Sequence, residues 1–290
     1  MTEHCCHHAE DPHRRQFLVY LVGATGGFAL AGCTSTDVAD RLGSIAMISP
    51  AEERAMGEAA WQDIKDELTL SDDTAANERL QTVGQRIVDA GGNPDEDWEF
   101  ALFEDPAINA FALPGGKVGF YTGILEVMEN DAQLAAVMGH EVGHVNARHG
   151  ARRVSAQRAT AIGLHALETA LQIGDVARAG EIAGVLGAGV VYGVIMPYSR
   201  AHELEADELG VRYMARAGYD PAESVRFWQA MGERSEGGRP PEFLSTHPAE
   251  ERRIRELRRM LPEVQPVYEE NRLTDAALQR LLGRLRATPG

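Results

Sequence analysis

The chain has 290 residues, of which 44% are hydrophobic, so it can bury a substantial core and disorder is not expected. Its 44 acidic and 28 basic residues leave a formal net charge of −16, which argues against nucleic acid or an anionic lipid surface as the main partner. All three cysteines, Cys5, Cys6 and Cys33, lie in the first 33 residues. The body of the chain therefore has no thiol for a disulfide, a thiolate metal site or a cysteine nucleophile.

The N-terminal segment has the layout of an export signal. Arg14 and Arg15 precede an uncharged run over 17–31 that is shorter than the roughly 20 residues of a spanning helix. The sequence Leu30-Ala31-Gly32-Cys33 then resembles the lipobox of bacterial lipoproteins, in which the chain is cut before the cysteine and the cysteine is acylated. We expect a signal peptide at 1–32 and a lipid on Cys33. The mature protein would be anchored in a membrane, the outer one where there are two, and face the periplasm. The arginine pair also resembles a twin-arginine signal, so that route and general export both stay open.

After the signal, residues 33–48 show little periodicity and are expected to form a tether. A helix is predicted from Pro50, with Ser49 as its N-cap, and a second helix over 72–90 ends at the breaker sequence 91–94. The period then changes to that of strands. Short strands are predicted at 98–103, 110–113 and 118–121, around turns at 105–106 and 114–116.

From Asp131 onward the chain is predicted to be mostly helical, apart from 237–241. The apolar stretch 182–196 is too short to span a bilayer and indicates a buried core helix. The alternative is a surface that dips into a membrane or holds an apolar substrate. Residues 49–261 are thus expected to form one α+β, mostly helical domain, and 262–290 one more helix with a loose end.

The predicted helix over 132–148 carries the sequence His140-Glu141-Val142-Gly143-His144. Two imidazoles four residues apart project from one face of a helix, where both can reach a single zinc ion. Glu141 does not bind the metal, but it can take a proton from the water on zinc and later give it to the leaving amine. The Gly and His that extend this motif in metzincins are absent, because Ala147 and Gly150 occupy those places.

A third ligand is expected downstream, where Glu203 and Asp207 lie four residues apart on a predicted helix. One carboxylate can bind the metal while the other holds a ligand histidine by its second nitrogen. Glu205 points away from that face and is expected to be solvated, and His202 is expected to be a surface neighbour. Both remain minor alternatives for the ligand.

Three segments together resemble one family. They are the motif His140 to His144, the run Ser199-Arg200-Ala201-His202-Glu203-Leu204-Glu205-Ala206-Asp207-Glu208-Leu209-Gly210, and Asn109-Ala110-Phe111-Ala112-Leu113-Pro114-Gly115-Gly116. The chain resembles, over roughly 50–260, the zinc metallopeptidase family that contains HtpX, BepA, LoiP and the CAAX prenyl proteases. The resemblance implies a zincin-like domain with one zinc ion and a small sheet whose edge strand flanks the helix of His140. It also implies that Glu203 is the third ligand and Asp207 its support.

The same resemblance implies further roles. The edge strand would bind an extended peptide as an added strand, with Asn109, Ala110, Phe111 and Ala112 as the substrate-binding residues. Ser245-Thr246-His247-Pro248 resembles a segment in which the histidine occupies the open metal position as a switch. Carried over, His247 would gate the zinc, and Arg253 would help to stabilise the oxyanion. Without the resemblance, His247 would be a turn residue that caps a helix.

Three functions follow as hypotheses. The first is a zinc endopeptidase that trims or clears misfolded or misassembled envelope proteins, with protein or peptide substrates and no nucleic acid. The second is an assembly factor or holdase that uses the same fold mainly to bind clients. The third is a zinc hydrolase that acts on a non-peptide amide.

Overall fold

The computed structural model describes residues 48–156, 165, 169, 200–235, 241–249 and 251–286. The predicted signal peptide, Cys33, almost all of the tether and the apolar stretch at 182–196 lie outside the described residues. Within the described ranges, no helix is both long enough and apolar enough to cross a membrane.

Local sequence signals start the first two helices. α3 (Pro50–Glu67) begins with a capping box, in which the Ser49 side chain accepts from the Glu52 N–H and the Glu52 carboxylate accepts from the Ser49 N–H at 2.8 Å. α4 (Thr74–Gly91) begins at Asp73, whose side chain accepts from the N–H of Ala76 at 2.9 Å. α3 begins at the predicted residue, and α4 lies within two residues of its predicted bounds.

Three strands form a small mixed sheet with the order β1-β3-β2. β1 (Glu99–Phe103) runs parallel to β3 (Lys117–Tyr121), and β2 (Ala110–Leu113) runs antiparallel to β3. The tight turn between β2 and β3 contains Gly115 and Gly116 at φ 88° and 83°, in the left-handed region that favours glycine. β2 is an edge strand of the sheet, as the family resemblance implied.

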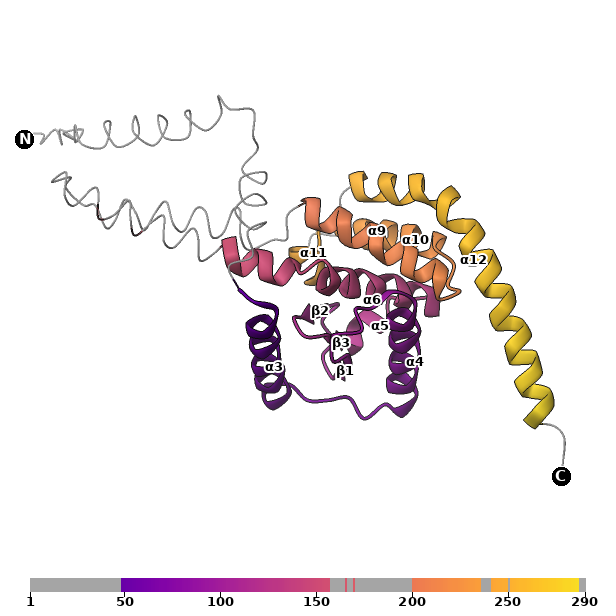
Figure 1. The fold of residues 1–290 in the computed structure, drawn as a ribbon, viewed down its shortest axis with the longest axis horizontal. Coiled ribbons are helices and arrows are strands. Elements are labelled where there is room, and N and C mark those ends of the chain that lie inside the picture. Colours follow the sequence, from indigo (N-terminus) through magenta and orange to yellow (C-terminus); the bar gives the residue numbers. More distant parts are fainter. Residues whose placement is uncertain are drawn as a thin grey trace, which may run out of the picture.

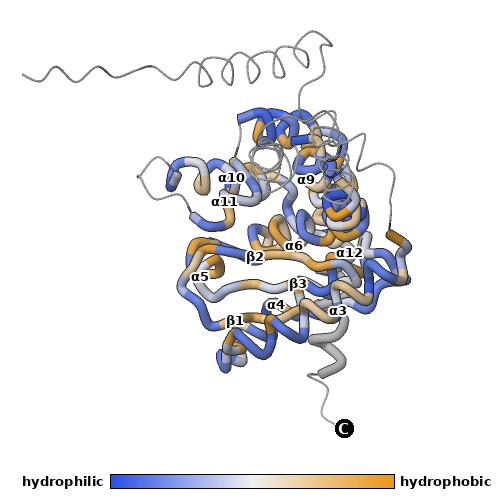
Figure 2. The backbone as a smooth tube through the Cα atoms, turned by 90° about the vertical axis from the view of Figure 1, so that its left-hand side faces the viewer, coloured by the Kyte–Doolittle hydropathy of each residue, from blue (hydrophilic) through white to orange (hydrophobic). Residues whose placement is uncertain are grey.

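Helices cover both faces of the sheet. Trp61 of α3 packs with Ala101 and Phe103 on one face, whereas α4 and α6 (Asp131–Asn146) pack on the other. Figure 1 shows the sheet between α3 and α4, and Figure 2 shows the strands in the order β2, β3, β1 with α6 on the β2 side. The short α5 (Thr122–Leu125) follows β3 directly. The helix with the two histidines therefore runs beside the predicted substrate strand.

Small residues bring α6 very close to α9 (Arg200–Arg216). A Cβ on Gly143 would lie 2.9 Å from the Ala206 carbonyl oxygen, and one on Gly139 would lie 3.0 Å from the Gly210 carbonyl oxygen. Such contacts with backbone atoms leave no room for a side chain, so the two backbones can approach only because glycine stands at these positions. The close approach brings the side chains of the two helices to one centre.

The last elements are α10 (Ala222–Ser235), α11 (Phe243–Thr246) and α12 (Glu251–Arg286). A separate helix was expected over 262–290, but α12 starts at Glu251 and continues through Pro262 and Pro266. Packing on the body explains this difference, because Leu257, Met260 and Val264 on this helix are all buried. The helix is bent, which is the usual effect of prolines inside a helix (Figure 1).

Candidate metal centre

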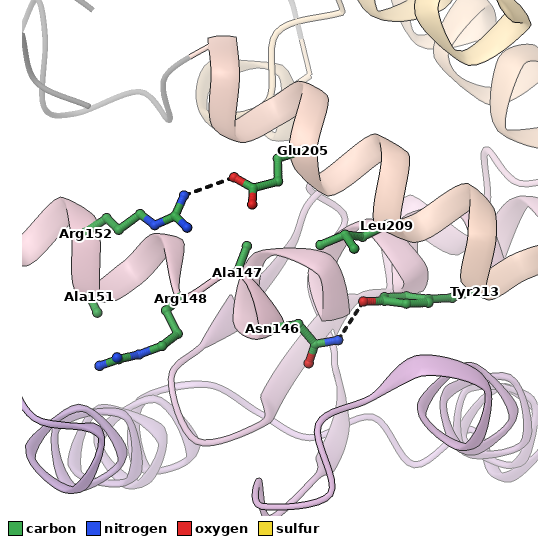
Figure 3. A pocket seen from close by; sticks show the side chains of 8 residues that line it. All are labelled: Asn146, Ala147, Arg148, Ala151, Arg152, Glu205, Leu209 and Tyr213. Carbon is green, nitrogen blue, oxygen red and sulfur yellow. Dashed lines mark hydrogen bonds and ion pairs between the residues drawn. The ribbon is translucent and has the colours of Figure 1, made fainter. Parts of the chain in front are cut away.

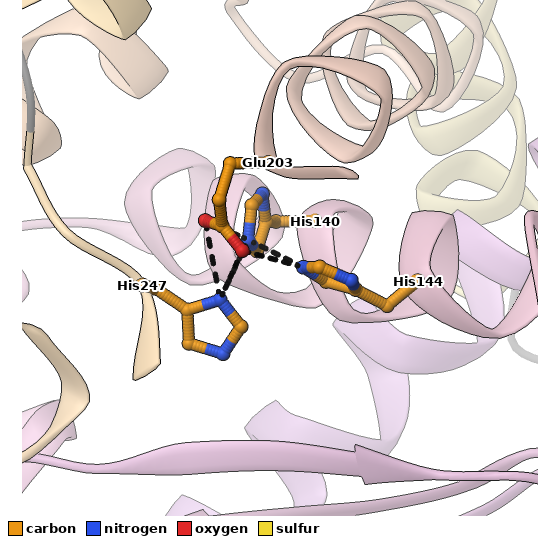
Figure 4. A group of neighbouring side chains, drawn as sticks. All are labelled: His140, His144, Glu203 and His247. Carbon is orange, nitrogen blue, oxygen red and sulfur yellow. Dashed lines mark hydrogen bonds and ion pairs between the residues drawn. The ribbon is translucent and has the colours of Figure 1, made fainter. Parts of the chain in front are cut away.

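Four buried side chains from three parts of the fold point toward one centre (Figure 4). His140 and His144 come from α6, Glu203 from α9, and His247 directly follows α11. The Nε2 atom of His140 lies 3.0 Å from Nε2 of His144 and 3.1 Å from Nδ1 of His247. The Glu203 carboxylate oxygens lie 3.4 Å from Nε2 of His140, 3.3 Å from Nε2 of His144 and 3.0 Å from Nδ1 of His247.

The donor set and its spacing fit a zinc ion. Three imidazole nitrogens and one carboxylate are ligands that zinc prefers, and in a tetrahedral zinc site such atoms lie about 3.3 Å apart. The four potential ligand atoms, one from each residue, all lie within 4.8 Å of one another. The cluster brings together the three ligands expected from the sequence, His140, His144 and Glu203, and adds His247 beside them.

Two further buried residues, Asp207 and Arg253, hold the ligand side chains in place through hydrogen bonds and ion pairs. Asp207 Oδ1 accepts from Nδ1 of His140 at 2.9 Å, which is the support expected from the four-residue spacing. Arg253 donates to both oxygens of Asp207 at 2.7 Å, and its Nη1 lies 2.8 Å from Glu203 Oε2 and 3.1 Å from the Pro248 carbonyl oxygen. Its guanidinium also stacks on Trp228, with 3.7 Å between the guanidinium carbon and the ring centre. The N–H groups of Arg253 thus contact both the candidate ligand Glu203 and the carboxylate of Asp207.

The charges around the centre shift the pKa values of its members. Burial would raise the pKa of Glu203, but His247, Arg253 and His140 outweigh it and hold that pKa well below the usual range. Burial lowers the pKa of His140, but Glu203 and the hydrogen bond to Asp207 raise it to about 9. Burial lowers the pKa of His144 to about 3. The carboxylate is therefore charged, as a metal ligand must be, and His144 is neutral.

Glu141 is the catalytic base expected from the sequence, and it lies beside this centre. Its Oε1 is buried, has no hydrogen-bond partner among the described residues and lies 3.6 Å from Nε2 of His247. Burial raises the pKa of its carboxyl. A carboxyl with a raised pKa and a free oxygen beside the open position can both accept and return a proton.

One expectation for α9 is wrong and one is confirmed. His202 was expected at the surface, but it is buried and stacks on His149 with ring centres 4.2 Å apart. Glu205 was expected to be solvated, and its side chain is 45% exposed; its Oε2 lies 3.1 Å from Nε2 of His149 and 3.0 Å from Nη1 of Arg152. His202 is buried because residues 149–156 pack against this side of α9. Neither residue belongs to the metal-ligand cluster.

The predicted substrate strand contacts the segment that carries His247. Asn109 Nδ2 donates to Glu242 at 3.2 Å, and the Ile108 carbonyl accepts from the N–H of Phe243 at 3.0 Å. Ala110 is buried, whereas Phe111 and Ala112 are partly exposed. We call residues 242–247 the His247 segment. One end of this segment contacts the residues just before β2, and the other end places His247 in the metal centre.

Two residues that support the centre were not predicted from the sequence. Trp228 of α10 supports Arg253, and its ring centre lies 5.5 Å from that of His140. His149 contacts His144. In the sequence it is distinguished only by its place, directly before Gly150, the position at which metzincins carry their third ligand. No spacing rule links either residue to the motif, since each reaches the centre through packing between helices.

Comparison with known protein families matches the part of the chain that contains this centre. The model of peptidase family M48 matches residues 74–261, which includes α4, the sheet, α6, α9 and the start of α12. These residues contain every member of the metal centre.

Curated relatives match over much of the chain. The mitochondrial metalloendopeptidase OMA1 of Saccharomyces cerevisiae is 32% identical over 280 residues, which are 90% of this chain and 78% of that protein. OMA1 of Schizosaccharomyces pombe is 36% identical over 188 residues, 64% of this chain and 53% of the relative. The β-barrel assembly-enhancing protease of Escherichia coli is 30% identical over 263 residues, 88% of this chain and 54% of the relative. The chain spans about half the length of the latter two proteins.

Proposed function

Because this chain belongs to peptidase family M48 and is a metallopeptidase, we propose that it is a zinc-dependent endopeptidase that cleaves misfolded or misassembled proteins of the cell envelope. The observation that carries the proposal is the buried cluster of His140, His144, Glu203 and His247 with Glu141 beside it. When bound there, zinc supplies Lewis-acid chemistry that makes water a nucleophile at neutral pH and polarises the scissile carbonyl. Glu141 then accepts a proton from the water and delivers it to the leaving amine.

The edge strand β2 supports a peptide substrate. The Asn109 carbonyl accepts from the N–H of Tyr121 at 3.1 Å, and in an antiparallel pair the next residues turn their backbone groups the other way. The N–H and C=O groups of Ala110 and Ala112 therefore face away from β3, where an extended chain can pair with them. Backbone pairing accepts many sequences but requires an unfolded stretch. This preference suits an enzyme that removes misfolded proteins.

Removal and return of the metal test the proposal. The full chain, purified under native conditions, is expected to contain one zinc ion, to cleave casein, to lose this activity with a chelator and to regain it with added zinc. Metal analysis and a fluorescent casein assay measure the two properties. Casein cleavage that persists in the metal-free protein would refute the zinc mechanism. A zinc protein that cleaves no peptide but hydrolyses other amides would support the third hypothesis.

We infer that His247 gates the site. A catalytic zinc needs an open position, and His247 would occupy it, because its Nδ1 lies 3.0 Å from Glu203 Oε1 and its segment is held beside β2 by Asn109 and Ile108. A substrate that pairs with β2 would compete for the place of this segment. His247→Ala is expected to raise basal casein cleavage severalfold, whereas Ser245→Ala, in the same segment but exposed, is expected to change nothing. An unchanged or lower rate for His247→Ala would argue against gating.

The proposed envelope location depends on the lipoprotein signal at 1–33. The S. cerevisiae and S. pombe relatives are mitochondrial by name, whereas the relative in E. coli is named for β-barrel assembly. Cys33→Ser is expected to release the protein from the membrane fraction of a bacterial host, because the acyl anchor needs the thiol. Cell fractionation with mass spectrometry of the N-terminus measures this release. The control Cys5→Ser with Cys6→Ser should stay anchored, and equal anchoring of the Cys33 variant would contradict the proposal.

A holdase remains the second candidate function. The name of the relative in E. coli refers to the assembly of β-barrels, and the centre holds four protein side chains close together. A closed centre with an available edge strand can bind clients without cleaving them. Glu141→Gln separates the two functions, because it removes the base and leaves the edge strand in place.

A further inference from the structure

The second nitrogens of the two helix histidines are held by different partners. His140 uses Nδ1 to contact Asp207, which Arg253 braces. On His144, Nδ1 lies 2.8 Å from Nδ1 of His149. A histidine that holds another histidine must have its own protons arranged correctly, because each neutral ring has one donor and one acceptor nitrogen.

A break in the helix brings His149 to this position. α6 ends at Asn146, the turn at Ala147 and Arg148 follows, and helical structure resumes over 149–156. Arg148 takes φ 55°, in the left-handed region that a non-glycine residue rarely adopts. The turn folds His149 back against His144, and His149 is fully buried there with His202 stacked on its ring.

The contacts of His149 determine which nitrogen carries its proton. Its Nε2 lies 3.1 Å from Oε2 of Glu205, and an ionised carboxylate can only accept a hydrogen bond. Nε2 therefore carries the proton, and Nδ1 presents a lone pair to His144. His144 must then donate from Nδ1, which leaves its Nε2 lone pair directed at the cluster with His140 and Glu203. The opposite arrangement would put a proton on the nitrogen that faces the metal.

We propose that His149, held by Glu205, is a positioning residue that orients His144 and sets its tautomer for zinc binding. This inference rests on the proposed zinc site. It gives each histidine ligand a chain of its own: His140 to Asp207 to Arg253, and His144 to His149 to Glu205 to Arg152. Mutation of such a partner usually weakens metal binding by about 10- to 100-fold.

The second chain ends at a surface pocket. Glu205 and Arg152 extend toward each other on the wall of a cavity of about 490 Å³, beside Ala147 and Leu209 (Figure 3). The side chain of Glu205 is 45% exposed, so it can be replaced without opening the core. This end of the chain therefore allows a test that does not depend on a buried substitution.

Zinc affinity of the full chain, measured by competition with a chromophoric chelator, tests the assignment. His149→Leu is expected to weaken zinc binding about 10- to 100-fold. His149→Asn should recover part of the loss, because its amide can offer an acceptor to Nδ1 of His144. Glu205→Ala should weaken binding less than His149→Leu. The matched control is Glu208→Ala, which lies on the same helix and contacts Arg212, and it should bind zinc like the parent.

A spectroscopic measurement completes the test. Nitrogen-15 NMR of the histidine rings in the zinc-loaded protein should show the proton of His144 on Nδ1 and that of His149 on Nε2. Parental zinc affinity in both a folded His149→Leu variant and Glu205→Ala would overturn the assignment, and so would a proton on Nδ1 of His149. A parent that binds no zinc would instead overturn the proposed zinc site itself. The failure of the two proposals is thus distinguishable.

Discussion

Glu141→Gln is expected to lower the kcat for casein cleavage by about 10²- to 10⁴-fold, the usual contribution of a general acid–base group. Glutamine has the same shape as glutamate but cannot accept the proton from water. The Oε1 atom of Glu141 has no hydrogen-bond partner among the described residues, so its replacement breaks no hydrogen bond of that atom. Zinc content and thermal stability should therefore stay at the parental level. Steady-state kinetics and metal analysis of the same preparation measure these quantities.

The control for this variant is Glu208→Gln, an exposed acid-to-amide change on α9 that should leave kcat unchanged. Complementation of a deletion strain then separates the two proposed functions. If proteolysis is the function, Glu141→Gln fails to complement although the protein is folded and zinc-loaded. Full complementation by Glu141→Gln would favour the holdase, because client binding needs the edge strand and not the base.

Arg253→Met is expected to destabilise the metal-free protein by about 3–5 kcal/mol, the cost of leaving buried charge unpaired. Arg253 contacts both Asp207 and Glu203, and all three are almost fully buried. Burial would raise the pKa of Asp207, but Arg253 lowers it, so the carboxylate remains ionised in the interior. Methionine fills a similar volume but neutralises neither carboxylate. Denaturant unfolding in the presence of a chelator measures the loss.

Arg255→Met provides the comparison on the same helix, because Arg255 also pairs with a carboxylate, Glu251, but is 64% exposed. Its loss should change the free energy of unfolding by less than about 0.5 kcal/mol. Added zinc should restore part of the stability of Arg253→Met, since the cation takes over part of the missing charge. Unchanged stability of Arg253→Met with a strongly reduced kcat would instead support the oxyanion role predicted from the sequence.

Much of the fold could be predicted because its signals are local. The capping box at Ser49 and Glu52, the cap at Asp73 and the glycines after Pro114 each act through atoms a few residues apart. The strand predicted at 110–113 matches β2. The boundary expected at 262 was wrong as a helix start, because buried side chains such as Val264 keep α12 continuous through its prolines.

The candidate site divides in the same way. Spacing by four residues puts His140 with His144 and Glu203 with Asp207 on common helix faces, and this requires only the geometry of one helix. The sequence, together with the family resemblance it carries, therefore predicted the chemistry: a two-histidine, one-carboxylate zinc site with Glu141 as its base.

The tertiary structure decided how these pieces meet. Gly139 and Gly143 let the α6 backbone touch α9, which no periodicity reveals because the fit depends on both surfaces. Tertiary packing also placed Arg253 against Asp207 and Glu203, and it brought His149 into contact with Glu205. Contacts between helices depend on three-dimensional packing and not on separation along the chain, and so only the fold could determine which side chains support the ligands.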